Sequence, residues 1–299
     1  MRTLTLAVLC ALISISIEAA PPAAQRTFAT PQEAAQALAS AAQDNDTAAL
    51  LKILGPEGKA IVSSGDPAED KAGRAHFARL AAEKVQIRQD QPDRNTVVAG
   101  SQEWPFPVPL VRENGAWRFD SAAGRVEVLA RRIGLHELNA AEVCRGYVEA
   151  QMEYSTRHRE GGAMHYAQRI ESAPGKQDGL YSETDRESLV PKSFAAAAAA
   201  MFAEGRKPAP YHGYYFHVLK AQGPDAEGGA ADYVVKGQMI GGFALVAFPA
   251  EYGVSGIQTF IVNQRGVVYA KDLGPTTMTL ARQMTAFNPD KTWKPAHTE

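Results

Sequence analysis

The stretch RRIGLHELNAAEVCRGYVEAQMEYS, residues 131–155, decides how the chain is organised, because it lies at the centre of 299 residues and has helical periodicity. In one helix over 136–158, each residue turns about 100° and rises about 1.5 Å. The apolar residues then share one stripe: Leu138, Ala141, Cys144, Val148 and Met152. The opposite face is charged: Glu142, Arg145, Glu149 and Glu153. The pattern predicts an amphipathic helix that supports a core, with Cys144 facing that core.

The same stretch contains residue types that bind metals, but their spacing argues against a site. His136 and Cys144 would lie roughly 12 Å apart along the helix axis, and His136 and Glu142 about 120° apart around it. A metal requires donor atoms within about 2–2.3 Å of one point. The segment HELNAAE also lacks the pair of histidines four residues apart found in zinc proteases. We interpret the helix as structural and expect no metal or cofactor.

The first residues have the composition of an export signal. Arg2 precedes an apolar run over 4–17, and small residues and Pro21-Pro22 follow it. We predict a signal peptide over 1–19, cleaved after Ala19, and a linker over 20–26. The run is too short for a stable membrane span, so we expect a periplasmic or secreted protein without a transmembrane helix in the mature chain. A lipoprotein anchored at Cys10 is the alternative, but Leu9 occupies the preceding position, where a small residue is expected.

Composition describes an ordinary globular protein, with 45% hydrophobic and 21% charged residues. The net charge of −2 and the lack of a long basic run argue against nucleic acid as the main partner. Removing 19 of 299 residues leaves 280, enough for two domains. Cys144 is then the only cysteine, so an intramolecular disulfide is impossible.

The sequence of the first half of the chain predicts an α+β domain over 27–134. Capping signals predict helices over 30–43, 46–55 and 66–83, and short strands follow at 85–87 and 96–98. Three prolines alternate with apolar residues in 104–110, which predicts one edge strand there. Asn114-Gly115 predicts a tight hairpin turn. A helix capped by Asp120 or Ser121 should end at Gly134, which marks the predicted domain boundary.

The second half predicts another α+β domain over 135–288, followed by a tail over 289–299. Its elements are the central helix, an Ala-rich helix over 193–203, strands over 214–221, 242–248, 257–263 and 267–272, and a closing helix over 276–287. The regular succession of the strands predicts a four-stranded antiparallel meander.

Three residues near the predicted ends of these strands are the candidates for chemistry. His212 lies in a loop beside Tyr211 and could act as a general base, and Glu251 and Lys271 are the nearby charged groups. YGVSG, residues 252–256, approaches the hydrolase motif G-x-S-x-G, but Ile257 replaces the second glycine. We favour structural roles for all three candidates and for Ser255. A hydrolase that uses them in an interdomain cleft is the alternative.

Six segments, WPFPVPLV, GAWRFDSAAG, RRIGLHEL, YVEAQMEY, YHGYYFHVLKAQG and FALVAFPAEYGVSGIQTFIVNQRGVVYAKDLG, closely resemble an exported bacterial family, domain of unknown function 2950 (DUF2950). The resemblance covers nearly all of the mature chain. It implies a Gram-negative envelope location but no activity, so it supplies no catalytic residues. Leu135 and His136 depart from the more polar pair expected in the family.

Two broader resemblances concern shape. Residues 27–134 resemble the cystatin-like cone of the nuclear-transport-factor-two (NTF2) superfamily, whose members often enclose a pocket. The second half resembles the head of a type IV pilin or pseudopilin, although a polar domain replaces the apolar stem. We therefore expect a non-catalytic binding or assembly module whose partner is an envelope protein or a small ligand. Its oligomeric state is left open.

The export signal predicts the start of the mature protein. N-terminal sequencing of protein recovered from the periplasm should begin near Ala20, because the small residues before it suit signal peptidase. An intact Met1, or a lipid on Cys10, would contradict the prediction.

Overall fold

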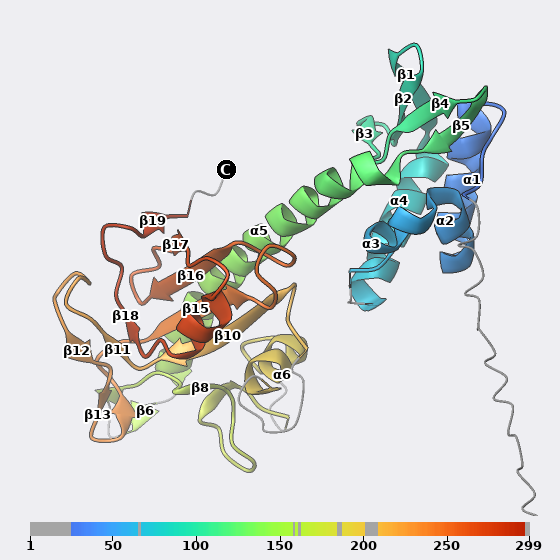
Figure 1. Ribbon diagram of the computed structural model, residues 1–299. Coiled ribbons are helices and arrows are strands. Elements are labelled where there is room, and N and C mark those ends of the chain that lie inside the picture. Colours follow the sequence, from blue (N-terminus) through green and yellow to red (C-terminus); the bar gives the residue numbers. More distant parts are fainter. Residues whose placement is uncertain are drawn as a thin grey trace, which may run out of the picture. The chain divides into compact units, whose positions relative to one another are not determined.

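The computed structural model describes residues 25–64, 67–157, 159–160, 163–183, 187–200 and 209–296 (Figure 1). The predicted signal peptide and the end of the tail lie outside these residues. The described chain is α+β, with seven α-helices and mostly antiparallel sheets, as the sequence predicts. It divides into two compact units, Met1–Glu127 and Val128–Glu299, and each is described by itself.

The first two helices of the first unit begin where the sequence places capping residues, whereas the predicted cap of the third, Asp66, lies outside the described residues. Thr30 accepts a hydrogen bond from the Glu33 N–H at 3.2 Å, and Asp46 accepts one from the Ala49 N–H at 2.9 Å. These bonds satisfy N–H groups that have no partner inside the helix. The helical elements are α1 (Pro31–Gln43), α2 (Thr47–Leu54), the 3-10 turn η1 (Pro56–Gly58), α3 (Lys59–Val62) and α4 (Pro67–Glu83).

The sheet of the first unit has the order β1-β2-β4-β5, and β3 also pairs with β2. Its strands are β1 (Val85–Gln91), β2 (Arg94–Ala99), β3 (Trp104–Pro105), β4 (Leu110–Glu113) and β5 (Ala116–Phe119). The prediction of one edge strand over 104–110 was wrong, because β3 ends at Pro105 and β4 starts only at Leu110. The Phe106 N–H still reaches Val97 O at 2.8 Å, but the prolines remove the donors that would extend this ladder.

The long helix α5 (Ser121–Arg157) is uninterrupted, so the predicted helix break at Gly134 was wrong. Gly134 has no positive φ, and a Cβ placed there would meet nothing within 4 Å. Glycine inside a helix costs roughly 1 kcal/mol relative to alanine, which is too little to end a helix that packing stabilises on both sides. The division between the units falls within this helix, between Glu127 and Val128.

The buried face of α5 is rotated relative to the predicted stripe. Cys144 is fully buried, as predicted, but Leu138 and Met152 are 54% and 40% exposed. Tyr147 and Gln151 take the core positions instead. Their polar atoms are satisfied, because the Gln151 amide donates to Tyr147 Oη and to Ala167 O, both at 2.8 Å. Apolar periodicity misplaced the face because it counts only apolar residues, whereas a hydrogen-bonded polar residue can also be buried.

The second unit is built on a five-stranded sheet with the order β10-β15-β16-β17-β19 (Figure 1). The first four strands form the predicted antiparallel meander: β10 (Tyr214–Leu219), β15 (Ala244–Pro249), β16 (Gln258–Asn263) and β17 (Tyr269–Asp272). The fifth strand, β19 (Lys294–Pro295), comes from the predicted tail. The buried face of α5 and this sheet contribute to one hydrophobic core.

Shorter elements complete the second unit. They are β6 (Arg159–Glu160), β7 (Ala163–Met164), β8 (Arg169–Glu171), β9 (Gly179–Tyr181), α6 (Lys192–Ala200), β11 (Ala221–Gln222), β12 (Ala231–Asp232), β13 (Val234–Val235), β14 (Gln238–Met239), α7 (Thr277–Arg282) and β18 (Ala286–Phe287). The closing helix is thus shorter than predicted. After α7 the chain extends, and β18 pairs in parallel with β11.

Two glycines of α5 test the role of packing along it. Gly134→Ala should stabilise the protein by about 0.5–1 kcal/mol, because alanine favours helix and the added methyl meets open space. Gly124→Ala should destabilise it, because the methyl would lie 2.8 Å from Val108 Cα. Urea unfolding measures both changes. Destabilisation by the alanine at 134 would contradict a continuous helix.

The lone thiol provides a test of the helix register. Burial raises the pKa of Cys144 to about 12 and removes it from solvent, so a thiol reagent should label it only after unfolding. Labelling kinetics with and without denaturant measure this. Rapid labelling of the native protein would place this face of α5 in solvent.

Candidate functional site

The candidates His212 and Glu251 lie at one end of the main sheet, where β10 begins and β15 ends. Tyr214 is paired with Pro249 there, and both candidate side chains are exposed. The His212 ring contacts the Tyr211 ring with centroids 4.3 Å apart, and its φ of 48° marks a tight turn. Neither side chain has a described hydrogen bond to a nucleophile.

Lys271 lies on β17, which is three strands from β10 in the sheet order. At about 4.8 Å per strand, that separation is about 14 Å. The Lys271 ammonium is 3.8 Å from an Asp290 carboxylate oxygen and 5.7 Å from the centroid of the Trp293 ring. The described contacts of the Lys271 ammonium are therefore with residues near the C-terminus of the chain. The structure brings His212 and Glu251 to the same sheet end and leaves Lys271 apart.

Helix α5 holds the loop between β15 and β16 through two adjacent residues. His136 is buried, and its Nδ1 lies 2.8 Å from the Ser255 carbonyl oxygen, so Nδ1–H is the donor. One carboxylate oxygen of Glu137 accepts the N–H groups of Ile257 and Gln258, at 2.9 and 3.0 Å. His136, which the sequence offered as a metal ligand or a structural residue, is thus part of a structural clamp.

Two glycines allow close approach at this clamp. A Cβ at Gly213 would lie 2.3 Å from His136 Nδ1, and one at Gly256 would lie 2.2 Å from the Tyr214 hydroxyl. That hydroxyl donates to Gln258 O at 2.9 Å, and burial followed by the nearby Glu137 carboxylate raises the pKa of Tyr214. Ser255 serves the same loop, as its hydroxyl accepts from the Glu251 N–H at 2.9 Å. The sheet end is therefore a network of structural contacts, and the YGVSG serine is a turn residue in it.

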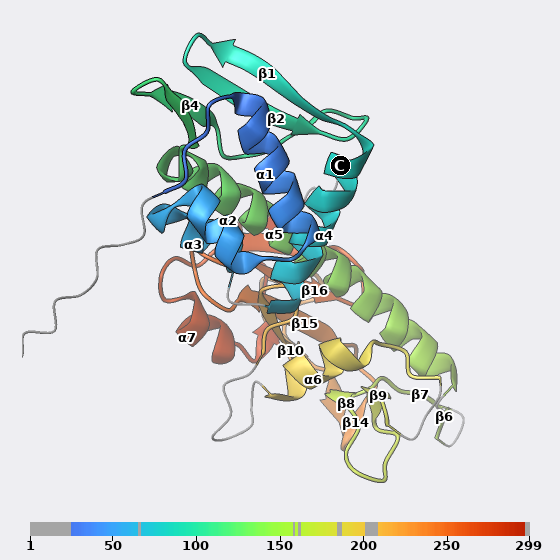
Figure 2. The same cartoon turned by 90° about the vertical axis from the view of Figure 1, so that its right-hand side faces the viewer.

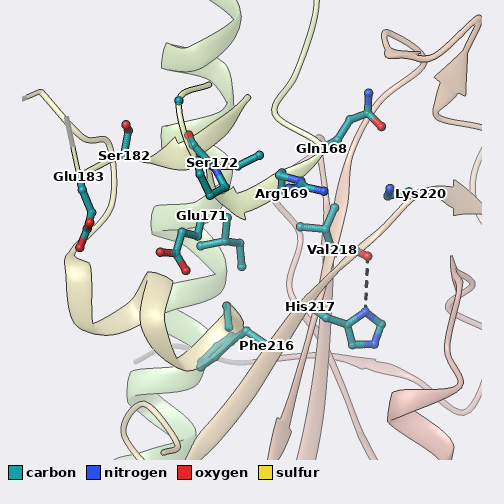
Figure 3. A pocket seen from close by; sticks show the side chains of 15 residues that line it. Gln168, Arg169, Glu171, Ser172, Ser182, Glu183, Phe216, His217, Val218 and Lys220 are labelled. Atoms are coloured by element: carbon teal, nitrogen blue, oxygen red, sulfur yellow. Dashed lines mark hydrogen bonds between the residues drawn. The ribbon is translucent and has the colours of Figure 1, made fainter. Parts of the chain in front are cut away.

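A cavity of about 870 Å³ lies elsewhere, along the outer edge of β10 (Figure 3). Its walls are β10, the segment 168–175 that includes β8, residues 182–183 after β9, and α6. Helix α6 lies beside β8 and β9 (Figure 2). The cavity floor is partly apolar, with Phe216 fully buried and Val218 half-buried. This size falls in the range of ligand sites.

Charged groups are separated along the cavity. Glu171 and Glu183 lie toward one end, and Arg169 and Lys220 toward the other (Figure 3). Lys192 is 3.2 Å from a Glu183 carboxylate oxygen and so offsets charge at the acidic end. No such ion pair is described for Arg169 or Lys220 among the residues that the structure places. The second end therefore favours an anionic group.

His217 borders the cavity but is committed to the fold. Its Nε2 is 2.9 Å from the Ala281 carbonyl oxygen, and burial lowers the pKa of the imidazole. It is therefore neutral at pH 7, with Nε2–H as the donor. Its Nδ1 lies 3.4 Å from Val218 O, which is a weak contact (Figure 3). This geometry does not describe a general base aimed at a substrate.

A second cavity, of about 660 Å³, shares Gln168, Arg169 and Lys220 with the first. His165 borders it, with a buried Nδ1 that has no hydrogen-bond partner within the described parts of the chain. In those same parts, no three His, Cys, Asp or Glu side chains are grouped so that they could hold a metal.

Sequence reasoning missed the cavity because its residues come from an irregular passage. Arg169, Glu171 and Lys220 match no catalytic motif. The available signal was the length of the stretch between the central helix and the Ala-rich helix, since long irregular segments in a compact domain are often functional.

The DUF2950 family, described as a protein family of unknown function, has a model that matches residues 25–296. The chain belongs to this family, as its motifs indicate. No curated protein and no solved structure matches it.

The clamp on the loop between β15 and β16 gives a stability prediction. Glu137→Ala should cost about 2–4 kcal/mol of unfolding free energy, because it leaves two backbone N–H groups without their acceptor. Glu137→Gln keeps an acceptor oxygen and should cost less. Glu142→Ala, on the exposed face, is the control and should change stability by under about 0.5 kcal/mol. Equal effects at 137 and 142 in urea unfolding would exclude the clamp.

Proposed function

We propose that this DUF2950 protein is a non-catalytic binding or assembly module whose ligand occupies the cavity along β10. The observation that carries the proposal is the cavity itself, a half-apolar space of about 870 Å³ with a cationic end. Its walls combine regular elements, which are β8, β10 and Ala198 of α6, with the irregular residues 172–175 and 182–183. Such preformed concave surfaces are the usual sites of ligand binding.

The charged and hydroxyl groups around the cavity favour binding over catalysis. Ser172 accepts the Gly179 N–H at 3.1 Å and is thus engaged in the loop. The described histidine at its border, His217, donates to a backbone carbonyl. A hydrolase would need a nucleophile held by a base within hydrogen-bond reach. The alternative that uses His212, Glu251 and Lys271 has less support, because two of these side chains are exposed and the third lies on a distant strand.

The proposed location is the periplasm or the cell exterior of a Gram-negative bacterium, as an exported protein. The signal-like sequence of residues 1–19 supports it. Within the described residues, no helix combines the length and the apolar character needed to cross a membrane.

We also propose a likeness in shape for each unit. For the first, helices that share a core with an antiparallel sheet support a cystatin- or NTF2-like cone. For the second, a long helix with an antiparallel meander supports a pseudopilin-like head. In this proposal the pseudopilin-like unit carries the ligand cavity.

Photo-crosslinking in the native host tests the proposal. Benzoylphenylalanine in place of Val218, inside the cavity, should give a covalent adduct of defined mass, because a bound ligand would lie within reach. The same amino acid in place of Val267, which is 43% exposed and not part of the cavity wall, is the control. Mass spectrometry detects both protein and small-molecule adducts. No adduct at 218, or equal adducts at both positions, would contradict binding in the cavity.

A further inference from the structure

Strand β10 is the edge of its sheet, and the register defines which of its backbone groups face outward. Its partner is β15 alone, with Tyr214 opposite Pro249 and Leu219 opposite Ala244. The Ala250 N–H donates to Gly213 O at 2.9 Å, so these two residues form a hydrogen-bonded pair. Hydrogen-bonded pairs alternate along an antiparallel ladder. Residues 215, 217 and 219 therefore bond to β15, and residues 214, 216 and 218 point the other way.

Pro249 agrees with this assignment. It has no N–H, and it stands opposite Tyr214, at a position where the ladder needs no bond between the two strands. The outward backbone groups of Tyr214 already have partners. Its N–H donates to Tyr211 O at 3.1 Å, and its C=O accepts the Tyr211 N–H at 2.9 Å. Within the described residues, the part of this edge without a backbone partner is therefore Phe216 and Val218; the Val218 carbonyl oxygen lies 3.4 Å from His217 Nδ1.

This edge lacks backbone partners among the described residues. Strand β8 lies beside it but pairs with β9 in a separate two-stranded sheet. Neither the outward N–H nor the outward C=O of Phe216 has a described hydrogen bond, although Phe216 is fully buried. Buried backbone groups without partners are costly and rare. These groups border the same cavity that the charged residues line.

We propose that the cavity receives an extended peptide segment, which adds as a strand to the edge of β10 and places a carboxylate beside Arg169 and Lys220. The inference rests on the proposed binding function and names its ligand class. Main-chain hydrogen bonds to Phe216 and Val218 would supply affinity, as in other cases of strand addition. The charge separation supplies polarity, since Arg169 and Lys220 are both exposed at the end opposite Glu171 and Glu183.

A single substitution separates backbone recognition from side-chain recognition. Val218→Pro removes the outward N–H at 218 and leaves the ladder bonds to β15 in place, because those bonds belong to residues 217 and 219. Val218→Thr keeps the N–H and the branched shape and is the matched control. Circular dichroism and thermal unfolding verify that both variants fold.

The probe is a randomised heptapeptide library with free C-terminal carboxylates, selected on the mature wild-type protein. Enriched peptides should bind Val218→Pro about tenfold more weakly than wild type, or worse, and bind Val218→Thr within about threefold. N-methylation at alternate peptide positions should abolish binding, and at the intervening positions it should not, because one set of N–H groups faces β10. This second measurement decides the question even if the proline variant fails to fold.

Charge substitutions test the proposed contact between the peptide carboxylate and the cationic end of the cavity. Lys220→Glu should weaken the binding of enriched peptides at least about fivefold at low salt, and 0.5 M salt should reduce that difference. Lys291→Glu, which lies outside the cavity wall, should leave affinity unchanged.

Three outcomes would overturn the inference. The first is that no peptide is enriched, and the second is that peptide binding is insensitive to both Val218→Pro and N-methylation. The third is that the wild-type protein sediments as a dimer and Val218→Pro abolishes that dimer. The last would assign the edge of β10 to a second copy of the chain. A small-molecule adduct at position 218 in host cells, together with no peptide binding, would overturn strand addition and retain the binding function. If neither an adduct at position 218 nor peptide binding is found, strand addition and the proposed binding function are both contradicted.

Discussion

The second unit depends on the burial of one face of α5 in the core that it shares with the main sheet. Cys144, Tyr147 and Gln151 are each at most 1% exposed, and Gln151 satisfies its amide on Tyr147 and on the backbone of Ala167. This amide orders the chain just after the helix, because it both donates to and accepts from the Ala167 backbone. A buried polar group that is fully hydrogen-bonded favours one register over others, since a shifted helix would leave it unpaired.

The contacts made by α5 also explain how the chain is held at the sheet end that carries His212 and Glu251. His136 and Glu137 form hydrogen bonds with the backbone of the loop between β15 and β16. Gly213 has no side chain, which leaves room for the His136 imidazole. A histidine whose Nδ1 donates to a carbonyl inside a packed site is a positioning group for the chain. The cavity lies along the other edge of β10, where no strand pairs with β10 among the described residues and the segment 168–175 forms part of the wall. An unpaired sheet edge presents N–H and C=O groups with which another chain can pair.

How much could be predicted depended on whether the signal was local. Thr30, Asp46 and Asp120 cap helices as their sequence neighbours indicate, and Asn114-Gly115 adopts the two positive φ angles of a tight hairpin, 50° and 80°. The four-stranded meander was predicted from the succession of strand-like runs, and its strands pair in the order in which they follow along the chain. The site could not be predicted in this way. Arg169, Glu171 and Lys220 are ordinary charged residues in the sequence, and they share a cavity only after β8 and α6 lie against the edge of β10.

The sequence by itself determined the α+β class, the positions of the caps and turns, the burial of Cys144 and the family to which the chain belongs. The tertiary structure alone decided that α5 runs through Gly134, that its core face includes Gln151, and that the edge of β10 faces a cavity. The physical reason is the range of the interactions. Caps, turns and periodicity depend on residues three or four positions apart. The continuity of α5, the hydrogen bonds of the buried Gln151 amide and the cavity beside β10 depend on residues far apart in the chain.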